Sequence, residues 1–166
     1  PAAMAFPTKN ITIVVPTAAG GGNDQMARTI AQKLGGLLGQ SVIVENRAGA
    51  NGSIASEFVA RATPDGHTLL FHSVAVSVNP SLFRNAGYEL LKDFEPVAMA
   101  GVTPNLLFVN PSVKATNLAE LIALARTTPL SYASSGNGTT THLGAELLFR
   151  SLAGVDITHV PHRAFE

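Results

Sequence analysis

Short apolar runs and segments of helical periodicity alternate along the first half of the chain. The runs at 11–15, 42–46 and 68–72 predict strands. Between them, apolar residues recur with the spacing of a helix over about 23–34 and 53–62. Because a helix separates each strand from the next, the pattern predicts a parallel sheet with helices on its faces and these strands as neighbours.

The same spacing predicts which side chains face the core. The first helix should bury Met26, Ala27, Ile30, Ala31 and Leu34, and the second should bury Ile54, Phe58 and Val59. The strand at 42–46 should be buried, since its apolar run is nearly continuous. Glycines at positions 35, 36 and 39 should follow the end of the first helix.

A glycine-rich turn joins the first strand to the first helix. Pro16 ends the strand because it has no N–H to donate to a ladder, and glycines 20–22 follow. Glycine allows positive φ and leaves the backbone open to a ligand. Asn23 or Asp24 is expected to cap the helix, whose free N–H groups and dipole favour an anion. The turn therefore predicts an anion site, although its glycines could instead serve only a tight connection.

The segment after the third strand is predicted to complete one lobe and begin another. Residues 79–83 suggest a short helix, and apolar runs at 93–99 and 105–109 suggest two further strands. A Thr-Pro pair breaks the chain between these strands. We therefore expect a first α/β lobe over 1–102 and part of a second α/β lobe over 103–166.

The second half of the chain repeats the strand, turn and helix of the first. Asn117 is predicted to cap a helix that ends before Pro129. A short strand at 131–134, a glycine-containing turn and a helix over about 140–153 follow. Hydroxyl groups accompany the backbone donors of this turn, so both could bind an oxygen-rich ligand. The alternative is that these Ser and Thr side chains serve only the helix cap.

Composition limits the partners of the chain. Charged residues make up 13%, and 11 basic residues balance 11 acidic ones. This balance leaves no positive field to hold nucleic acid, so an anion would be held by local dipoles. There is no cysteine, which excludes disulfides and thiol catalysis, and no apolar run reaches the length of a membrane span. An Ala-x-Ala pattern among the first residues is a hint of export.

The sequence offers little to an enzyme. The first turn lacks the last glycine of a dinucleotide fingerprint, and neither a phosphate-binding loop nor a Gly-x-Ser-x-Gly elbow occurs. We therefore expect a binding protein without a cofactor. His159 and His162 form only a weak metal pair. Asp24 is expected to be a cap or dipole partner rather than a base. Arg47 is expected to pair with an anion or, more commonly, to be solvated or in a salt bridge between elements.

Motifs along the whole chain resemble the Bug family of extracytoplasmic solute-binding receptors of tripartite tricarboxylate transporters. The residues that carry the resemblance are the runs at 14–24, 44–52, 63–70, 79–83, 92–97 and 136–143. The resemblance implies a periplasmic protein with a periplasmic binding protein type 2-like fold, whose two lobes of parallel or mixed sheets close on a small mono- or dicarboxylate. It also implies the membrane components of such a transporter as partners.

The family's binding elements can be carried over to this chain. In the family, two glycine-containing turns act as pincers, with backbone amides and ordered waters that hold the carboxylate. Carried over, the ligand-binding residues are Thr17, Ala18, Ala19, Gly20, Gly21, Gly22, Asn23 and Asp24 in the first turn, Ser73, Val74 and Ala75 after the third strand, and Ser134, Ser135, Asn137, Gly138, Thr139 and Thr140 in the second turn.

Family chains continue well past the segment that resembles residues 156–161, whereas this sequence stops at Glu166. On this comparison the chain is expected to be truncated, with an incomplete second lobe. A chain that lacks its returning segment could pair with a second copy, each supplying what the other is missing. A homodimer or non-transporting remnant is therefore the alternative to a working receptor.

Overall fold

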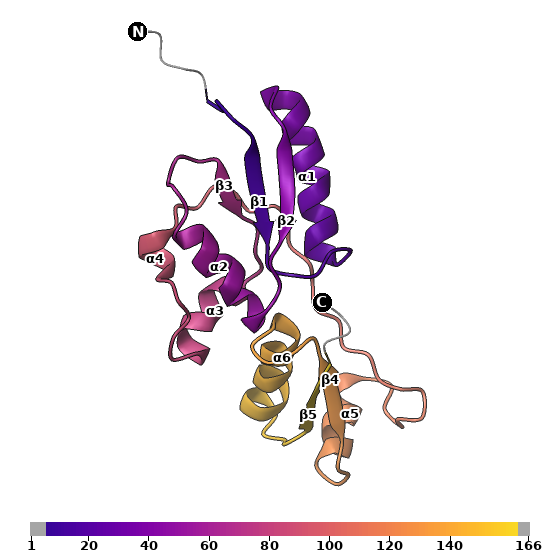
Figure 1. The fold of residues 1–166 in the computed structure, drawn as a ribbon. Coiled ribbons are helices and arrows are strands. Elements are labelled where there is room, and N and C mark those ends of the chain that lie inside the picture. Colours follow the sequence, from indigo (N-terminus) through magenta and orange to yellow (C-terminus); the bar gives the residue numbers. More distant parts are fainter. Residues whose placement is uncertain (1–5, 163–166) are drawn as a thin grey trace. The chain divides into compact units, whose positions relative to one another are not determined.

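The computed structural model describes residues 6–162, which form two compact units (Figure 1). The first unit runs to Pro96 and the second begins at Val97. This division and the predicted lobe boundary after residue 102 both lie in the segment 94–110, which contains no helix or strand. The lobe boundary itself stays a prediction. The Ala-x-Ala pattern near the start of the chain lies outside the described residues.

The first unit is built on a parallel sheet. Its strands are β1 (Ile11–Val15), β2 (Val42–Asn46) and β3 (Thr68–Leu70). β1 lies between the other two, and Ile13 pairs with Val44 across one ladder and with Leu69 across the other. The predicted parallel sheet is confirmed, with β3 ending before residue 72.

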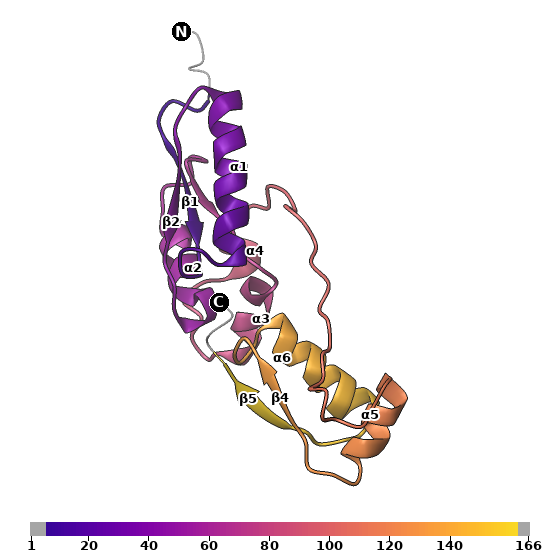
Figure 2. The same ribbon diagram turned by 90° about the vertical axis from the view of Figure 1, so that its right-hand side faces the viewer.

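Helices connect these strands and cover the sheet (Figures 1 and 2). They are α1 (Gly22–Leu38), the 3₁₀ turn η1 (Ala50–Gly52), α2 (Ser53–Ala60), α3 (Ala75–Leu82) and α4 (Leu90–Asp93). α1 packs on β1 and β2, whereas α2 packs on β1 and β3. The crossover through α1 runs from β1 to β2, and the crossover through α2 runs from β2 back across β1 to β3. Because these two connections run in opposite directions across the sheet and are both right-handed, α1 and α2 lie on opposite faces of the sheet.

The core of this unit lies between β1 and α1. Ile13 and Val15 of β1 pack against Ala27 and Ala31 of α1, and all four side chains are buried. The small alanine side chains let the helix lie close to the sheet. Val14 points to the other face and is also fully buried, so both faces are covered as is usual for parallel strands.

The helices bury fewer large side chains than their periodicity predicts. In α2 the buried residues are Ala55 and Ser56, whereas Ile54 and Phe58 are exposed by 48% and 37%. In α1, Met26 is exposed as well. The prediction was wrong at these positions because the apolar stripe of each helix is wider than its contact with a narrow sheet. Only the small residues nearest the strands are fully buried on the apolar stripes, whereas Ile30, Leu34 and Val59 are partly buried.

Several element boundaries and environments also differ from the prediction. α1 continues through Gly35 and Gly36 and ends at Gly39, whose φ of 64° is the left-handed conformation that closes a helix. β2 is an edge strand rather than a buried one, and its Ile43 is 49% exposed. α3 begins at Ala75, earlier than predicted, and carries a proline in its interior.

The second unit pairs two parallel strands with helices. Its elements are α5 (Leu118–Ala125), β4 (Ser131–Ser134), α6 (Thr140–Ala145), the π-helix η2 (Glu146–Leu152) and β5 (Thr158–Pro161). β4 pairs with β5. The core gathers Leu121 of α5, Phe149 of η2, and Val155 and Ile157 on the approach to β5. α6 and η2 together replace the single helix predicted over 140–153.

The predicted cap of α5 is confirmed. Asn117 is the N-cap, and its Oδ1 accepts the N–H of Glu120 at 3.0 Å. Within residues 6–162, no helix has both the length and the apolar character needed to cross a membrane.

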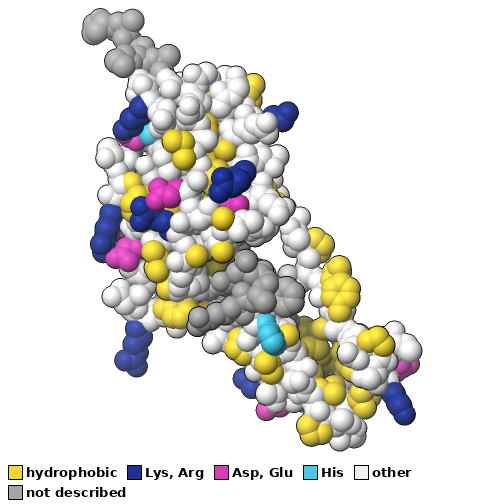
Figure 3. Space-filling view, turned by 45° about the vertical axis from the view of Figure 1, so that its right-hand side comes forward, with side chains coloured by type: hydrophobic (Ala, Val, Ile, Leu, Met, Phe, Trp, Pro, Cys, Tyr) yellow, Lys and Arg dark blue, Asp and Glu magenta, His cyan; other side chains and the backbone are white. Residues whose placement is uncertain are grey.

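The strands predicted at 93–99 and 105–109 do not form in the described part of the chain. Their apolar side chains are exposed instead, with Val97 at 82% and Phe108 at 81%. A strand needs a partner for its N–H and C=O groups, and no described strand pairs with these segments. An apolar run predicts an extended chain but supplies no partner. Figure 3 shows that apolar side chains reach the surface in both units.

Candidate ligand-binding turns

The turn between β1 and α1 keeps an open backbone, but only one of its glycines needs a left-handed conformation. Gly20 has a φ of 89°, whereas Gly21 has an ordinary φ of −71°. A Cβ on Gly20 or Gly22 would meet no atom of the described chain within 4 Å. Gly21 is the N-cap of α1, so the prediction that Asn23 or Asp24 caps this helix was wrong.

Asp24 organises the turn from within, and it is only 2% exposed. Its Oδ2 accepts the N–H of Gly20 at 2.8 Å and the Nε–H of Arg28 at 3.0 Å, while Oδ1 accepts from Asn46 Nδ2 at 2.9 Å. The hydrogen bond from Arg28, followed by those from the Gly20 amide and Asn46, holds the pKa of this carboxyl well below its usual range. Asp24 was expected at the helix dipole, and its carboxylate is in fact used to fix the turn.

Other backbone donors of this turn have no partner among residues 6–162. The Gly20 amide is bound by Asp24, and the Gly21 amide makes a long hydrogen bond of 3.4 Å to the carbonyl of Ala18. The amides without a hydrogen bond are those of Thr17, Ala18, Ala19, Gly22, Asn23 and Asp24. Unpaired donors beside open space at the N-terminus of a 17-residue helix are suited to an anion.

Behind the turn, the ends of two neighbouring strands are packed tightly together. Pro16 follows β1 and His72 follows β3. A Cβ on Gly52 would lie 2.2 Å from His72 Nε2 and 2.9 Å from Pro16 Cβ. Burial lowers the pKa of the His72 imidazole. Gly52 therefore permits a close approach of these strand ends that the sequence did not predict.

The loop after β3 uses most of its own donors. The Ser73 N–H donates to His72 Nδ1 at 2.9 Å, and the Ala75 N–H donates to Ser73 Oγ at 3.4 Å. Val74 is 49% exposed, and its N–H has no partner within the described residues. Of the three predicted ligand residues here, Val74 is the one whose amide remains available.

The turn between β4 and α6 uses its hydroxyl groups internally. Ser134 Oγ accepts the N–H two residues further on at 3.1 Å, and the Ser135 N–H donates to Thr141 Oγ1 at 3.2 Å. Thr139 is the N-cap of α6, and its Oγ1 accepts the N–H of His142 at 3.4 Å. Of the two alternatives left open by the sequence, these hydroxyl contacts favour the cap.

The exposed tip of this second turn remains available. The N–H groups of Asn137 and Thr140 have no hydrogen bond within residues 6–162, and Asn137 is exposed. The Thr140 hydroxyl makes only a long contact of 3.5 Å with Asn105 Oδ1. Gly138, with a φ of 79°, is buried, and its N–H donates to His142 Nδ1 at 3.1 Å.

Sequence reasoning missed a stack of rings in this unit. His159 of β5 lies between Tyr132 of β4 and His142 of α6, with ring centroids 4.9 and 4.2 Å away. His159 had been considered only as half of a weak metal pair with His162. In the described part of the chain, no three metal-ligating side chains come together. Periodicity within one element cannot reveal a contact between β5 and α6.

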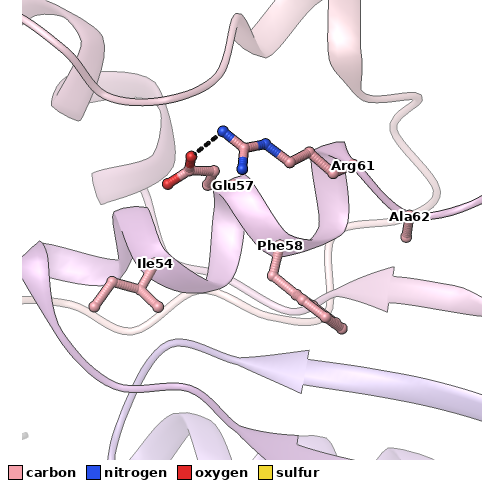
Figure 4. Close-up of a pocket in the computed structure, with 5 residues that line it drawn as sticks. All are labelled: Ile54, Glu57, Phe58, Arg61 and Ala62. Carbon is pink, nitrogen blue, oxygen red and sulfur yellow. Dashed lines mark hydrogen bonds and ion pairs between the residues drawn. The ribbon is translucent and has the colours of Figure 1, made fainter.

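A separate shallow depression of about 360 Å³ lies on the exposed face of α2 (Figure 4). It is lined by Ile54, Glu57, Phe58, Arg61 and Ala62, and Glu57 pairs with Arg61. Arg47 lies over the Phe58 ring, 3.5 Å from its centroid, and pairs with Glu45 at 2.7 Å. Arg47 therefore forms a salt bridge within the chain, with a residue only two positions before it. None of the predicted ligand-binding residues lines this depression.

Parallel strands followed by glycine-containing turns make this an α/β fold, and its matches to solved structures place it in the periplasmic solute-binding class. The structure titled R. palustris Rpa4515 with adipate matches with a TM-score of 0.84 at 40% identity. MatC (Rpa3494) from Rhodopseudomonas palustris with bound malate matches with a TM-score of 0.75 at 37% identity. The periplasmic binding protein BugD matches with a TM-score of 0.72 at 32% identity. Each match covers 95% of this chain and 53% or 54% of the other.

The chain belongs to the tripartite tricarboxylate transporter family receptors, whose family model matches residues 26–165. The UPF0065 protein in the tcbD-tcbE intergenic region of Pseudomonas sp. (strain P51) is 41% identical over 96% of this chain and 48% of its own length. Protein BugT of Bordetella pertussis is 38% identical over 95% of this chain and 49% of its own length. The chain spans about half the length of these curated relatives.

These findings confirm the resemblance to the Bug family and the predicted fold class. Members of this family are solute-binding receptors rather than enzymes, in line with the class of protein predicted from the sequence. The individual ligand-binding residues and the homodimer stay predictions.

Proposed function

We propose that this chain forms part of a periplasmic receptor that captures a small mono- or dicarboxylate and delivers it to the membrane components of a tripartite tricarboxylate transporter. Residues 17–24, 73–75 and 134–140 bind the ligand in this proposal. The observation that carries it is the group of unpaired amides beside open space at Gly20 and Gly22. The adipate named for Rpa4515 and the malate named for MatC support a carboxylate ligand.

Backbone amides supply the positive potential of the first turn. The turn itself contains no Arg or Lys, and the charge of Arg28 is engaged by Asp24 at 2.9 Å. The helix dipole stabilises an anion at an exposed N-terminus by about 0.3–1 kcal/mol, and by up to about 2 kcal/mol where the site is partly buried. Several amide hydrogen bonds together with this dipole account for anion binding without a side-chain cation.

Replacement of Gly22 by valine tests the proposal, with Gly36→Val as the matched control. Both glycines lie in α1, and a Cβ on either would meet nothing of the described chain within 4 Å. Both variants should therefore keep their stability to within about 1 kcal/mol. Gly22→Val places methyl groups beside the unpaired amides and should weaken adipate or malate binding by roughly tenfold or more, whereas Gly36→Val should not.

Isothermal titration calorimetry on the unmutated chain and both variants gives the affinities, and urea denaturation gives the stabilities. Equal affinity in the two variants would show that the first turn does not contact the ligand. If the unmutated chain binds none of acetate, malate, adipate and citrate, the proposed function is wrong for this chain.

A further inference from the structure

His142 joins the second turn to the stacked rings of β4 and β5. Its Nδ1 accepts the N–H of Gly138 at 3.1 Å, across the tip of the turn. On its other side its ring stacks on His159, with an interplanar angle of 22°. The ring of His142 therefore contacts both the turn and the strands that support it.

The hydrogen bond from Gly138 fixes the protonation of His142. A backbone N–H can only donate, so the nitrogen that accepts from it must carry no proton. Nδ1 is that nitrogen, and the single proton of the neutral ring must lie on Nε2. A proton added at Nδ1 would face the Gly138 N–H, and the hydrogen bond would be lost.

The surroundings also oppose a positive charge on this pair of rings. His159 contacts Ser134 Oγ at 2.6 Å, and burial together with the neighbouring His142 lowers the pKa of His159. Two imidazolium rings at 4.2 Å would repel each other.

Other polar groups around the pair only partly offset this repulsion. From β4, the hydroxyl of Tyr132 donates to Glu146 of η2 at 2.8 Å. Glu146 also pairs with Arg150 at 3.3 Å. The carboxylate of Glu146 favours a charge on His159, but less strongly than burial and His142 oppose it.

We infer that His142 is a positioning residue for ligand binding: its neutral ring holds Gly138 and thereby the tip of the turn at Asn137 and Thr140. This inference rests on the proposed function, because the tip is where the turn keeps free amides. Loss of this acceptor releases Gly138, and the tip loses its shape. Carboxylate affinity should therefore fall when the acceptor is removed.

Two substitutions separate the acceptor from the ring. His142→Asn places the side-chain oxygen one bond from Cγ, where Nδ1 stands in histidine, so it keeps the acceptor without the ring. His142→Phe keeps a flat ring without an acceptor. His162→Asn is the matched control, because His162 is exposed and only its backbone N–H contacts the turn, at Ser134 O, 2.9 Å away.

The experiment measures adipate and malate affinity by calorimetry. The unmutated chain, His142→Asn and His162→Asn should bind alike, whereas His142→Phe should bind more weakly by on the order of fivefold or more, because the Gly138 N–H has lost its acceptor. Full binding by His142→Phe, or an equal loss in His142→Asn and His142→Phe, would overturn the inference.

A second readout needs no ligand. In ¹H–¹⁵N spectra, the Gly138 amide should exchange with solvent slowly in the unmutated chain and in His142→Asn, and faster in His142→Phe. Equal exchange in all three chains refutes the role of His142. Faster exchange in His142→Phe, in a protein whose unmutated chain binds no carboxylate, supports the role of His142 in the turn and refutes the proposed function instead.

Discussion

Gly52→Ala should destabilise the first unit strongly, because the added methyl group has nowhere to go. At a φ of 85°, any L-residue pays about 1–2 kcal/mol of backbone strain. The new Cβ would also lie 2.2 Å from His72 Nε2 and 2.9 Å from Pro16 Cβ, and such overpacking adds about 1–3 kcal/mol. The total is a loss of about 2–5 kcal/mol, a large part of the stability of an ordinary domain.

Gly20→Ala is the control that separates strain from the contact. Its φ of 89° imposes nearly the same backbone strain, but its Cβ would meet nothing of the described chain within 4 Å. Gly20→Ala should therefore cost only about 1–2 kcal/mol. Any entropic gain from replacing glycine in the unfolded chain is common to both variants and cancels in the comparison.

Urea denaturation followed by far-ultraviolet circular dichroism measures both variants, since the chain has no tryptophan to report by fluorescence. The difference of about 1–3 kcal/mol should shrink when His72→Ala is added to Gly52→Ala, because the imidazole that the methyl group meets is then absent. If Gly52→Ala costs no more than Gly20→Ala, the close packing of β1 and β3 ends around Gly52 is refuted.

Two further predictions concern stability. Asn117→Ala removes the acceptor for the Glu120 N–H and should lower the free energy of unfolding by about 1 kcal/mol, whereas Asn117→Asp keeps an acceptor there. Thermal unfolding of both variants measures this difference, and equal stability would contradict the prediction. The hydrogen bond from Lys9 at 2.8 Å, followed by that from the His67 amide, lowers the pKa of Asp65 from 3.8 to about 2. The stability that the ionised Asp65 contributes should be present above pH 3.8 and lost as the pH falls towards 2. The urea midpoint of unfolding should therefore fall less steeply from pH 5 to 2 in Asp65→Asn than in the unmutated chain. Parallel curves for the two proteins would contradict this prediction.

The parallel sheet could be predicted from sequence because each of its strands and connecting helices has its own pattern of apolar residues within a short stretch of chain. Apolar runs mark β1 and β2, and the helical spacing between them requires a crossover. The start of α1 could not be placed in the same way. Asp24 is a good capping residue by type, but its carboxylate is used by Gly20, Arg28 and Asn46, and Asn46 comes from β2. A partner that far along the chain leaves no periodic signal.

The same limit applies to the candidate site. The glycine-rich turn at 20–22 was visible in the sequence because three adjacent glycines are rare in a strand-to-helix connection, and its open space is present. Which of its amides are free depends on a hydrogen-bond network that only the folded chain contains. His142 and His159 meet through elements separated along the chain, so neither spacing nor composition could connect them.

In the proposed receptor, the buried carboxylate of Asp24 bears on the affinity and the breadth of ligand recognition. Since this side chain already accepts a hydrogen bond from the Gly20 amide, the first turn has its shape before any solute arrives. A preformed turn loses little conformational entropy on binding, so more of the contact energy appears as affinity. The proposal therefore assigns shape and selectivity to different residues: those around the turn can change to suit another acid, while Asp24, Arg28 and Asn46 keep the backbone in place.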